Sequence, residues 1–186
     1  MILPFVRDLF REIERHASFQ TLAASARRDR GEILQLSGLS APARTLLLVL
    51  LQQATGRPVV ALTDSNRQAE AVTDLAETFY GLLSPGRDSG PLLLPEHDVL
   101  PWDGLPAHPD ISEKRAIALW RLAGDSPPPI LVTTIGAALR RLESRDYYRG
   151  LACRLVKGDE MALDLVVEEL QRIGYERHEP VEMVGQ

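Results

Sequence analysis

The chain has 186 residues, of which 45% are hydrophobic, 25% charged and 5% aromatic, and its formal net charge is −5. This composition is typical of a soluble globular protein with a sizeable core, and the acidic balance argues against a stand-alone nucleic-acid-binding protein. The single cysteine, Cys153, excludes an internal disulfide, and we expect it in the core. The longest apolar run, residues 46–51, is too short to span a membrane, and the first residues lack the pattern of a signal peptide. We therefore expect a cytoplasmic protein without membrane contact.

Hydrophobic residues at helical spacing predict an amphipathic helix at the amino terminus and a second helix over residues 18–28. The second helix leads into three arginines, Arg27, Arg28 and Arg30. We expect these cations to lie at a helix carboxyl end, where the helix dipole favours them, rather than to bind phosphate.

From residue 33 onwards the predicted strands and helices alternate. Strands are expected at residues 33–36, 59–62, 92–94 and 130–132, and helices at 42–55, 65–80, 111–123 and 135–142. The strand at 59–62 is continuously apolar, which is typical of a parallel strand that is buried on both faces. The alternation predicts a doubly wound α/β fold with a parallel sheet.

The pattern changes after residue 147. A strand at 151–156, a helix at 161–173 and a strand at 181–184 predict the start of a small α+β second domain. We therefore divide the chain into amino-terminal helices (1–30), an α/β domain (31–147) and a partial second domain (148–186).

The stretch GLSAPART, residues 38–45, has the frame of a phosphate-binding loop, G-x-x-x-x-G-K-[ST], without its central residues. Gly38 and Thr45 are in place, but Ala43 and Arg44 stand where glycine and lysine are needed. Pro42 also removes one of the backbone N–H donors, and no Asp-Glu pair at the end of a later strand could hold magnesium. We expect a relic loop that starts a packed helix, with no nucleotide bound and no catalysis.

The stretch LPEHDVLPWDGLPAHPDISEKRAIALWRL, residues 94–122, is rich in metal-ligand types, but prolines break their spacing, so no metal site is expected. The ligand types are Glu96, His97, Asp98, Asp103, His108 and Asp110. We expect a long surface crossover that Leu100 and Trp102 pin to the domain. Asp110 and Glu113 have the spacing of a capping box for the next helix.

Residues 94–122, followed by ILVTTIGAALRRL at 130–142, closely resemble the amino-terminal part of bacterial transcription-repair coupling factors (Mfd), which in turn resembles the excision-repair protein UvrB. The match covers the pattern from Leu100 to Arg115, and the final stretch resembles the start of the family's second domain, including Gly174 and Tyr175. The resemblance implies a helicase-like, P-loop NTPase-like fold with a degenerate phosphate loop. It also implies that the ATP- and magnesium-dependent DNA-translocating motor lies far downstream.

The resemblance further implies that the whole protein displaces stalled RNA polymerase from DNA and recruits UvrA through its second domain. In the family, UvrA docking uses an arginine in a strand that would follow Gln186, so we expect weak UvrA binding by this chain. Arg172 and Arg177 are the candidate partner-binding residues within it. Two alternatives remain open: a working nucleotide-binding helicase-type domain like UvrB itself, and an unrelated α/β domain.

Overall fold

The computed structural model describes residues 4–28, 33–86, 89–100, 102, 104–153, 155–158 and 160–176. The chain forms two compact units. The first unit is made of Met1–Glu96 and Pro127–Arg140, and the second of His97–Ser126 and Arg141–Gln186.

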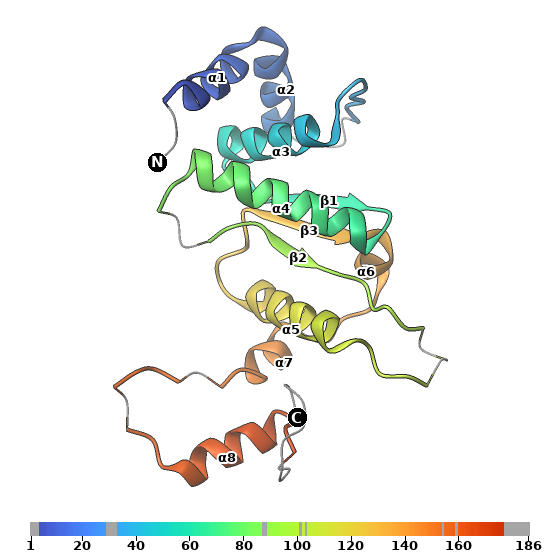
Figure 1. Ribbon diagram of the computed structural model, residues 1–186, viewed down its shortest axis with the longest axis vertical. Coiled ribbons are helices and arrows are strands. Elements are labelled where there is room, and N and C mark those ends of the chain that lie inside the picture. Colours follow the sequence, from blue (N-terminus) through green and yellow to red (C-terminus); the bar gives the residue numbers. More distant parts are fainter. Residues whose placement is uncertain are drawn as a thin grey trace. The chain divides into compact units, whose positions relative to one another are not determined.

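The first unit is built on a parallel sheet of β1 (Val59–Thr63), β2 (Leu92–Leu94) and β3 (Ile130–Thr134). The strand order is β1-β3-β2, with Val59 opposite Ile130 and Leu92 opposite Leu131 (Figure 1). Three of the predicted strands and the parallel α/β arrangement are therefore confirmed.

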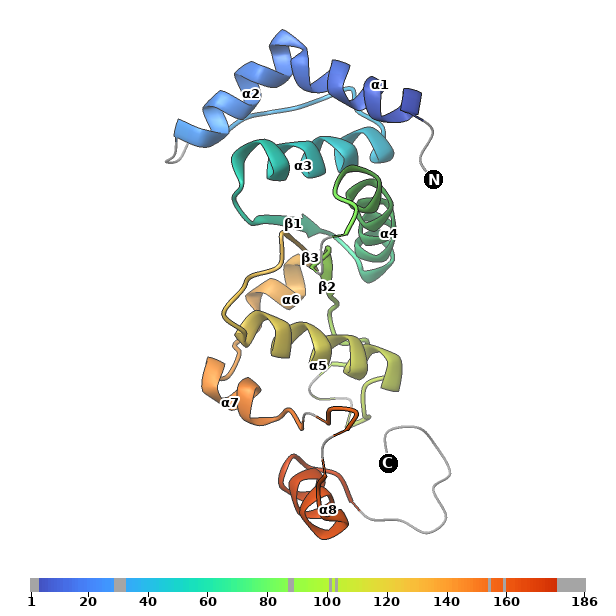
Figure 2. The ribbon, with the colours of Figure 1, turned by 90° about the vertical axis from the view of Figure 1, so that its left-hand side faces the viewer.

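Five helices belong to this unit: α1 (Pro4–Arg15), α2 (Ala17–Arg28), α3 (Ala41–Thr55), α4 (Asn66–Leu83) and α6 (Ile135–Leu139). Helix α4 contacts all three strands, and α3 packs on α4 and on α2 (Figures 1 and 2). The main core joins the sheet to α3 and α4 through Val49, Ala69, Ala76, Tyr80, Ile130 and Val132. A second core joins α2 to α3 through Phe19, Ala23 and Leu50.

The carboxyl ends of α2 and α3 are tied together by two arginines. Arg27 donates from Nε and Nη2 to the carbonyl oxygen of Ala54, at 3.2 and 2.6 Å. In return, Arg57 Nη1 donates to the carbonyl oxygen of Ala26 at 3.2 Å. Arg27 thus lies at a helix carboxyl end, as predicted, although the helix it caps is the neighbouring α3. Arg30 lies outside the described residues.

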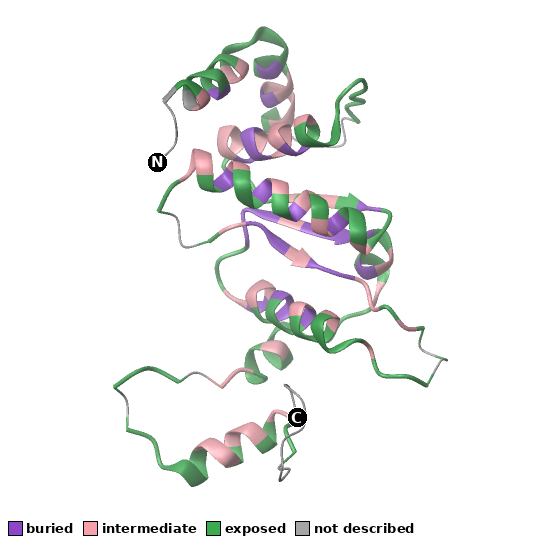
Figure 3. Cartoon of the chain, viewed as in Figure 1, coloured by how far each residue is buried: buried purple, intermediate pink, exposed green. Residues whose placement is uncertain are grey.

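The second unit contains α5 (Pro109–Ala123), α7 (Arg145–Gly150) and α8 (Leu163–Arg172). Helix α7 is anchored to the end of α5, because Arg149 Nε donates to the Ala123 carbonyl oxygen at 2.6 Å and Arg145 to that of Gly124 at 2.6 Å. No residue of α8, all of which are described, is buried (Figure 3).

The capping box predicted for α5 is wrong. The helix starts two residues earlier than expected, with Pro109 in its first turn and His108 as the N-cap. Nδ1 of His108 accepts a hydrogen bond from the Asp110 backbone N–H at 3.3 Å. Proline favours the first helical position because its fixed φ suits the helix and its missing N–H is not needed there. The helix therefore begins at Pro109 and not at residue 111.

Two of the predicted strands are not strands in the described chain. Residues 33–36 are irregular, with Ile33 95% exposed, and residues 151–153 and 155–156 are irregular too. An apolar run becomes a strand only when a neighbour completes its hydrogen bonds, and neither run has one among the described residues. The strand predicted at 181–184 lies outside them.

Burial was predicted wrongly at two places. The face of β1 that carries Val60 and Leu62 is exposed, so β1 is not buried on both faces. Trp102 is 77% exposed and Leu100 52% exposed, so they do not pin the crossover. Apolar residues are common on protein surfaces, and hydrophobicity alone does not place a loop residue inside. Cys153 is half-buried.

Candidate functional site

The amino end of α3 carries the loop that resembles a phosphate-binding loop. Gly38 has φ of +77°, the left-handed conformation that a phosphate loop also requires of glycine. Beyond Gly38, two of the first N–H groups of the helix have acceptors on Ser40. The Ser40 side chain accepts a long hydrogen bond from the Ala43 N–H at 3.5 Å, and the Arg44 N–H donates to the Ser40 carbonyl oxygen at 2.9 Å.

Thr45 and Arg44, which stand at the Ser/Thr and lysine positions of the loop pattern, have different surroundings. Thr45 is 1% exposed and its hydroxyl donates to the Ala41 carbonyl oxygen at 3.1 Å, so it is turned into the helix. Arg44 is exposed. Pro42, in the first turn, supplies no N–H. The loop therefore keeps the frame of a phosphate site without its donors.

Beside this helix start lies a groove of about 410 Å³, formed by α3, α4, β1 and the segment before α3. Its lining is mostly aliphatic, and among the described residues that line it only Arg44 is charged. The lining residues are Leu36, Leu39, Ala41, Arg44, Thr45, Leu47, Leu48, Val60, Ala61, Leu62, Thr63, Gln68, Ala71, Val72 and Leu75. Such a lining suits apolar side chains better than a triphosphate.

The carboxyl edge of the sheet, where parallel α/β folds usually bind ligands, is held by a polar cluster around Glu96. The side-chain amide of Asn66 donates to the Glu96 carbonyl oxygen and accepts from the Glu96 N–H, both at 2.8 Å. Thr134 Oγ1 donates to Glu96 Oε2 at 3.2 Å. The carboxyl group lies against Gly136, at a position that any Cβ there would occupy.

Sequence reasoning treated Glu96 only as a possible metal ligand and overlooked Asn66 and Thr134. The signal that could have found the cluster is their position, since each lies two to four residues after the end of a predicted strand. Parallel strands bring such residues together at one edge.

The other metal-ligand types of this stretch stabilise the start of α5. Asp98 accepts from the His108 N–H at 3.1 Å, and Asp110 pairs with Lys114 at 2.9 Å. Within the described part of the chain, no three His, Cys, Asp or Glu side chains are grouped as metal ligands. Asp103 lies outside that part.

Of the two candidate partner-binding arginines, Arg172 is described and Arg177 is not. Arg172 Nη2 donates to Glu169 Oε2 at 2.6 Å and Nη1 donates to the Gly150 carbonyl oxygen at 3.1 Å. The hydrogen bond from Arg172, with its positive charge, lowers the pKa of Glu169, and Glu169 in turn raises the pKa of Arg172. Arg172 therefore helps to hold α8 to the end of α7, and its side chain is exposed.

The fold and this site define a parallel α/β protein that has the frame of a phosphate loop. The sequence is 27% identical over 151 residues to the transcription-repair-coupling factor of Bacillus subtilis (strain 168), covering 81% of this chain and 12% of that protein. It is 30% identical over 159 residues to the transcription-repair-coupling factor of Myxococcus xanthus, covering 83% of this chain and 13% of that protein. No family model matches the chain.

The chain is thus related to the transcription-repair-coupling factors, which confirms the resemblance seen in its sequence. It spans about an eighth of the length of the curated relatives that it matches. None of the described helices has both the length and the hydropathy needed to cross a membrane.

Proposed function

We propose that this chain is a non-catalytic, UvrB-like interaction module of a transcription-repair coupling factor. In this proposal the α/β unit has the helicase-like, doubly wound topology, but its phosphate loop no longer binds nucleotide. The longer protein, in the cytoplasm, would displace stalled RNA polymerase from DNA with a separate ATP- and magnesium-dependent motor and recruit UvrA for nucleotide excision repair.

One observation supports the non-catalytic part of this proposal: several groups at the start of α3 are bonded within the helix or missing. Ser40 caps it, Pro42 has no N–H, and the Thr45 hydroxyl is turned into the helix. A nucleotide would have to displace these bonds, and Arg44 cannot replace the compact ammonium group that bridges the outer phosphates.

Calorimetric titration with ATP and magnesium tests this part. We expect no saturable binding tighter than about 100 μM, which corresponds to roughly −5.5 kcal/mol. The double variant Ala43→Gly/Arg44→Lys is the matched control, because it restores the loop pattern but leaves Pro42 and Ser40 in place. We expect no saturable heat of ATP binding from this variant either. Tight binding by the unaltered chain would favour the alternative, a nucleotide-binding domain like UvrB, which the left-handed Gly38 also fits.

The partner part of the proposal places UvrA docking in the second unit, with Arg172 at the contact. Arginine is common at the energetic centre of interfaces because it combines charge, several donors and a large contact area. Surface plasmon resonance with immobilised bacterial UvrA tests this. We expect weak, saturable binding that Arg172→Ala reduces at least about tenfold.

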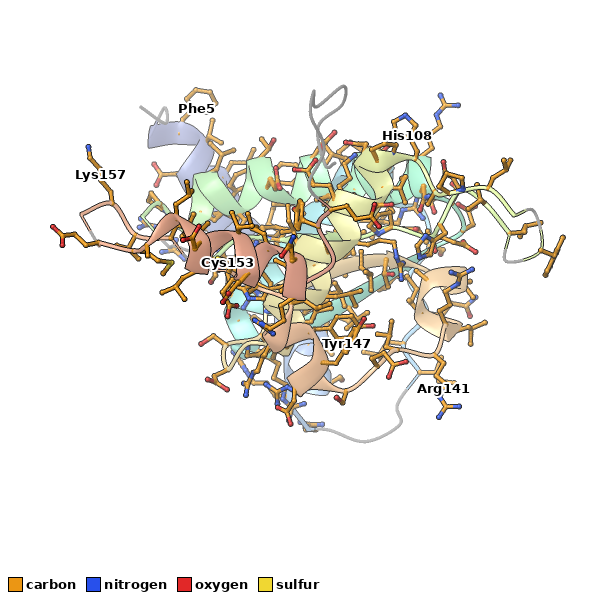
Figure 4. The ribbon with its side chains drawn as sticks, turned by 90° about the horizontal axis from the view of Figure 1, so that it is seen from below. Phe5, His108, Arg141, Tyr147, Cys153 and Lys157 are labelled. Atoms are coloured by element: carbon orange, nitrogen blue, oxygen red, sulfur yellow. The ribbon has the colours of Figure 1, made fainter. Side chains whose placement is uncertain are left out.

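Two further variants separate docking from folding. Lys157→Ala removes an exposed cation of the same unit (Figure 4) and should leave UvrA binding unchanged. Glu169→Ala removes one intramolecular partner of Arg172, which lies on the same helix, and leaves the bond to Gly150 and the arginine itself in place. If Glu169→Ala weakens UvrA binding as much as Arg172→Ala does, binding depends on the pair within α8 and not on the arginine alone, and the proposed contact is wrong.

A further inference from the structure

The groove along β1 meets an unpaired strand edge. Within the described chain β1 pairs with β3 alone. Val60 and Leu62, which alternate along β1 and line the groove, are 58% and 59% exposed. The segment before α3 adds Leu36 and Leu39 to the lining, and these are 53% and 39% exposed. Contiguous exposed aliphatic side chains of this kind mark an interaction surface.

The backbone of β1 also directs hydrogen-bonding groups toward that edge. The Val59 N–H donates to the Pro129 carbonyl oxygen at 3.0 Å, so Val59 faces the β3 side. In a parallel pair, the N–H and C=O of one residue point to the same side and those of the next residue point to the other. The N–H and C=O groups of Val60 and Leu62 therefore point outward. An occupant that is extended can pair with them, whereas a helix cannot.

Residues 33–36 are a second segment that could belong to the sheet, and Leu36 lines the groove together with residues of β1. It is apolar, but it is not part of the sheet, and Ile33 is 95% exposed. It is joined to β1 through the 15 residues of α3, which is the kind of connection that links parallel strands of one sheet. Between this segment and β1 lies the groove of about 410 Å³, and among its described lining residues only Arg44 is charged.

We propose that the groove accepts one extended strand with alternating apolar residues, which pairs with the free edge of β1 and brings residues 33–36 into the sheet. We infer that the same longer polypeptide supplies this strand, because relatives of this chain have about seven-eighths of their length outside the matched region. An intramolecular strand also avoids the aggregation that a free edge invites. The proposal does not depend on whether the module binds UvrA or nucleotide.

The probe for the test is a neutral peptide, acetyl-Gln-Val-Thr-Val-Thr-Val-Gln-amide, added to the whole 186-residue chain. Backbone amide exchange is followed by NMR. We expect the peptide to slow exchange at Val60 and Leu62 by at least about tenfold, with little change at Ala61, which faces β3. The same peptide N-methylated at each internal residue keeps its side chains and carbonyl groups. Its methyl groups stand where N–H groups would approach the Val60 and Leu62 carbonyl oxygens, so it cannot form the ladder and should give no protection.

A pair of variants makes the test independent of the probe's affinity for apolar surfaces. Leu62→Pro removes one outward N–H without removing a bond to β3, a substitution that edge strands tolerate. Leu62→Thr keeps the N–H and removes a similar amount of apolar surface. We expect Leu62→Pro to abolish protection at Val60 and Leu62→Thr to retain it, with circular dichroism spectra like that of the unaltered chain.

Three results would overturn the proposal. Equal protection by the N-methylated peptide would mean that the groove buries apolar groups without strand pairing. No protection at millimolar peptide would mean that the edge does not accept a strand. A dimer in sedimentation experiments with protected Val60 and Leu62 amides would make a second copy of the chain the occupant.

Discussion

Gly136→Ala is the sharpest test of the polar cluster at the carboxyl edge of the sheet. A Cβ at this position would overlap the carboxyl group of Glu96, so that side chain must turn away. Turning away breaks the hydrogen bond from Thr134, which is 3.2 Å long. A hydrogen bond to a charged group contributes about 1.5–3 kcal/mol, and the half-buried site puts this one near the lower end.

The substitution also has a favourable term, since alanine is better than glycine inside a helix by about 0.5–1 kcal/mol. The difference leaves Gly136→Ala destabilising by about 1 kcal/mol. Gly81→Ala in α4 is the matched control, because a Cβ there meets nothing within 4 Å and only the favourable term applies. The two variants should therefore change the free energy of unfolding in opposite directions in urea denaturation.

A double-mutant cycle makes the test independent of helix propensity. In a Glu96→Ala background the carboxyl group is gone, so Gly136→Ala should become stabilising, like Gly81→Ala. If Gly136→Ala is already stabilising in the unaltered chain, Glu96 does not lie over α6 and the cluster described above is wrong.

Three further predictions concern the surface. Trp102→Ala should change the free energy of unfolding by less than about 0.5 kcal/mol, because the side chain is 77% exposed, and a loss near 3 kcal/mol in denaturant melts would mean that it is buried. Arg27→Ala should lower the free energy of unfolding by about 1 kcal/mol, because it leaves the Ala54 carbonyl oxygen unpaired. Arg28→Ala, at an exposed neighbouring arginine, should have almost no effect. Equal losses in the two variants would mean that Arg27 does not stabilise the end of α3. Because Arg172 lowers the pKa of Glu169 in the folded chain, the pair stabilises above the ordinary carboxyl pKa of 4.5, and this contribution is lost as the pH falls through the lowered value. In an NMR titration, Arg172→Ala should raise the Glu169 midpoint toward 4.5, and an unchanged midpoint would contradict the pairing.

Local sequence patterns predicted the three strands of the sheet and the described helices other than α7, because these elements carry their own signals. The helix α4, for example, has a serine N-cap and an apolar stripe that Ala69, Thr73, Ala76 and Tyr80 bury. The parallel arrangement followed from the alternation of strands and helices. The caps and apolar stripes of single elements depend on residues that are close together in the sequence.

The wrong predictions depend on partners that local sequence does not specify. Whether residues 33–36 form a strand depends on a neighbouring strand, and whether Trp102 is buried depends on a surface for it to contact. In the candidate site, the missing lysine and glycine of the phosphate loop could be read directly. The cluster of Asn66, Glu96 and Thr134 could not, because its members are 30 and 38 residues apart and meet only when the sheet forms.

The pair of hydrogen bonds between the Asn66 side chain and the Glu96 backbone has a mechanical consequence. Both polar atoms of one carboxamide hold the N–H and the C=O of a single residue, each at 2.8 Å. Glu96 is also the last residue of the first unit before the chain enters the second. Tension applied through the following residues would load both hydrogen bonds at once instead of opening them one after the other. A force that pulls on the residues after Glu96 would therefore have to break both hydrogen bonds to Asn66 before it extends β2.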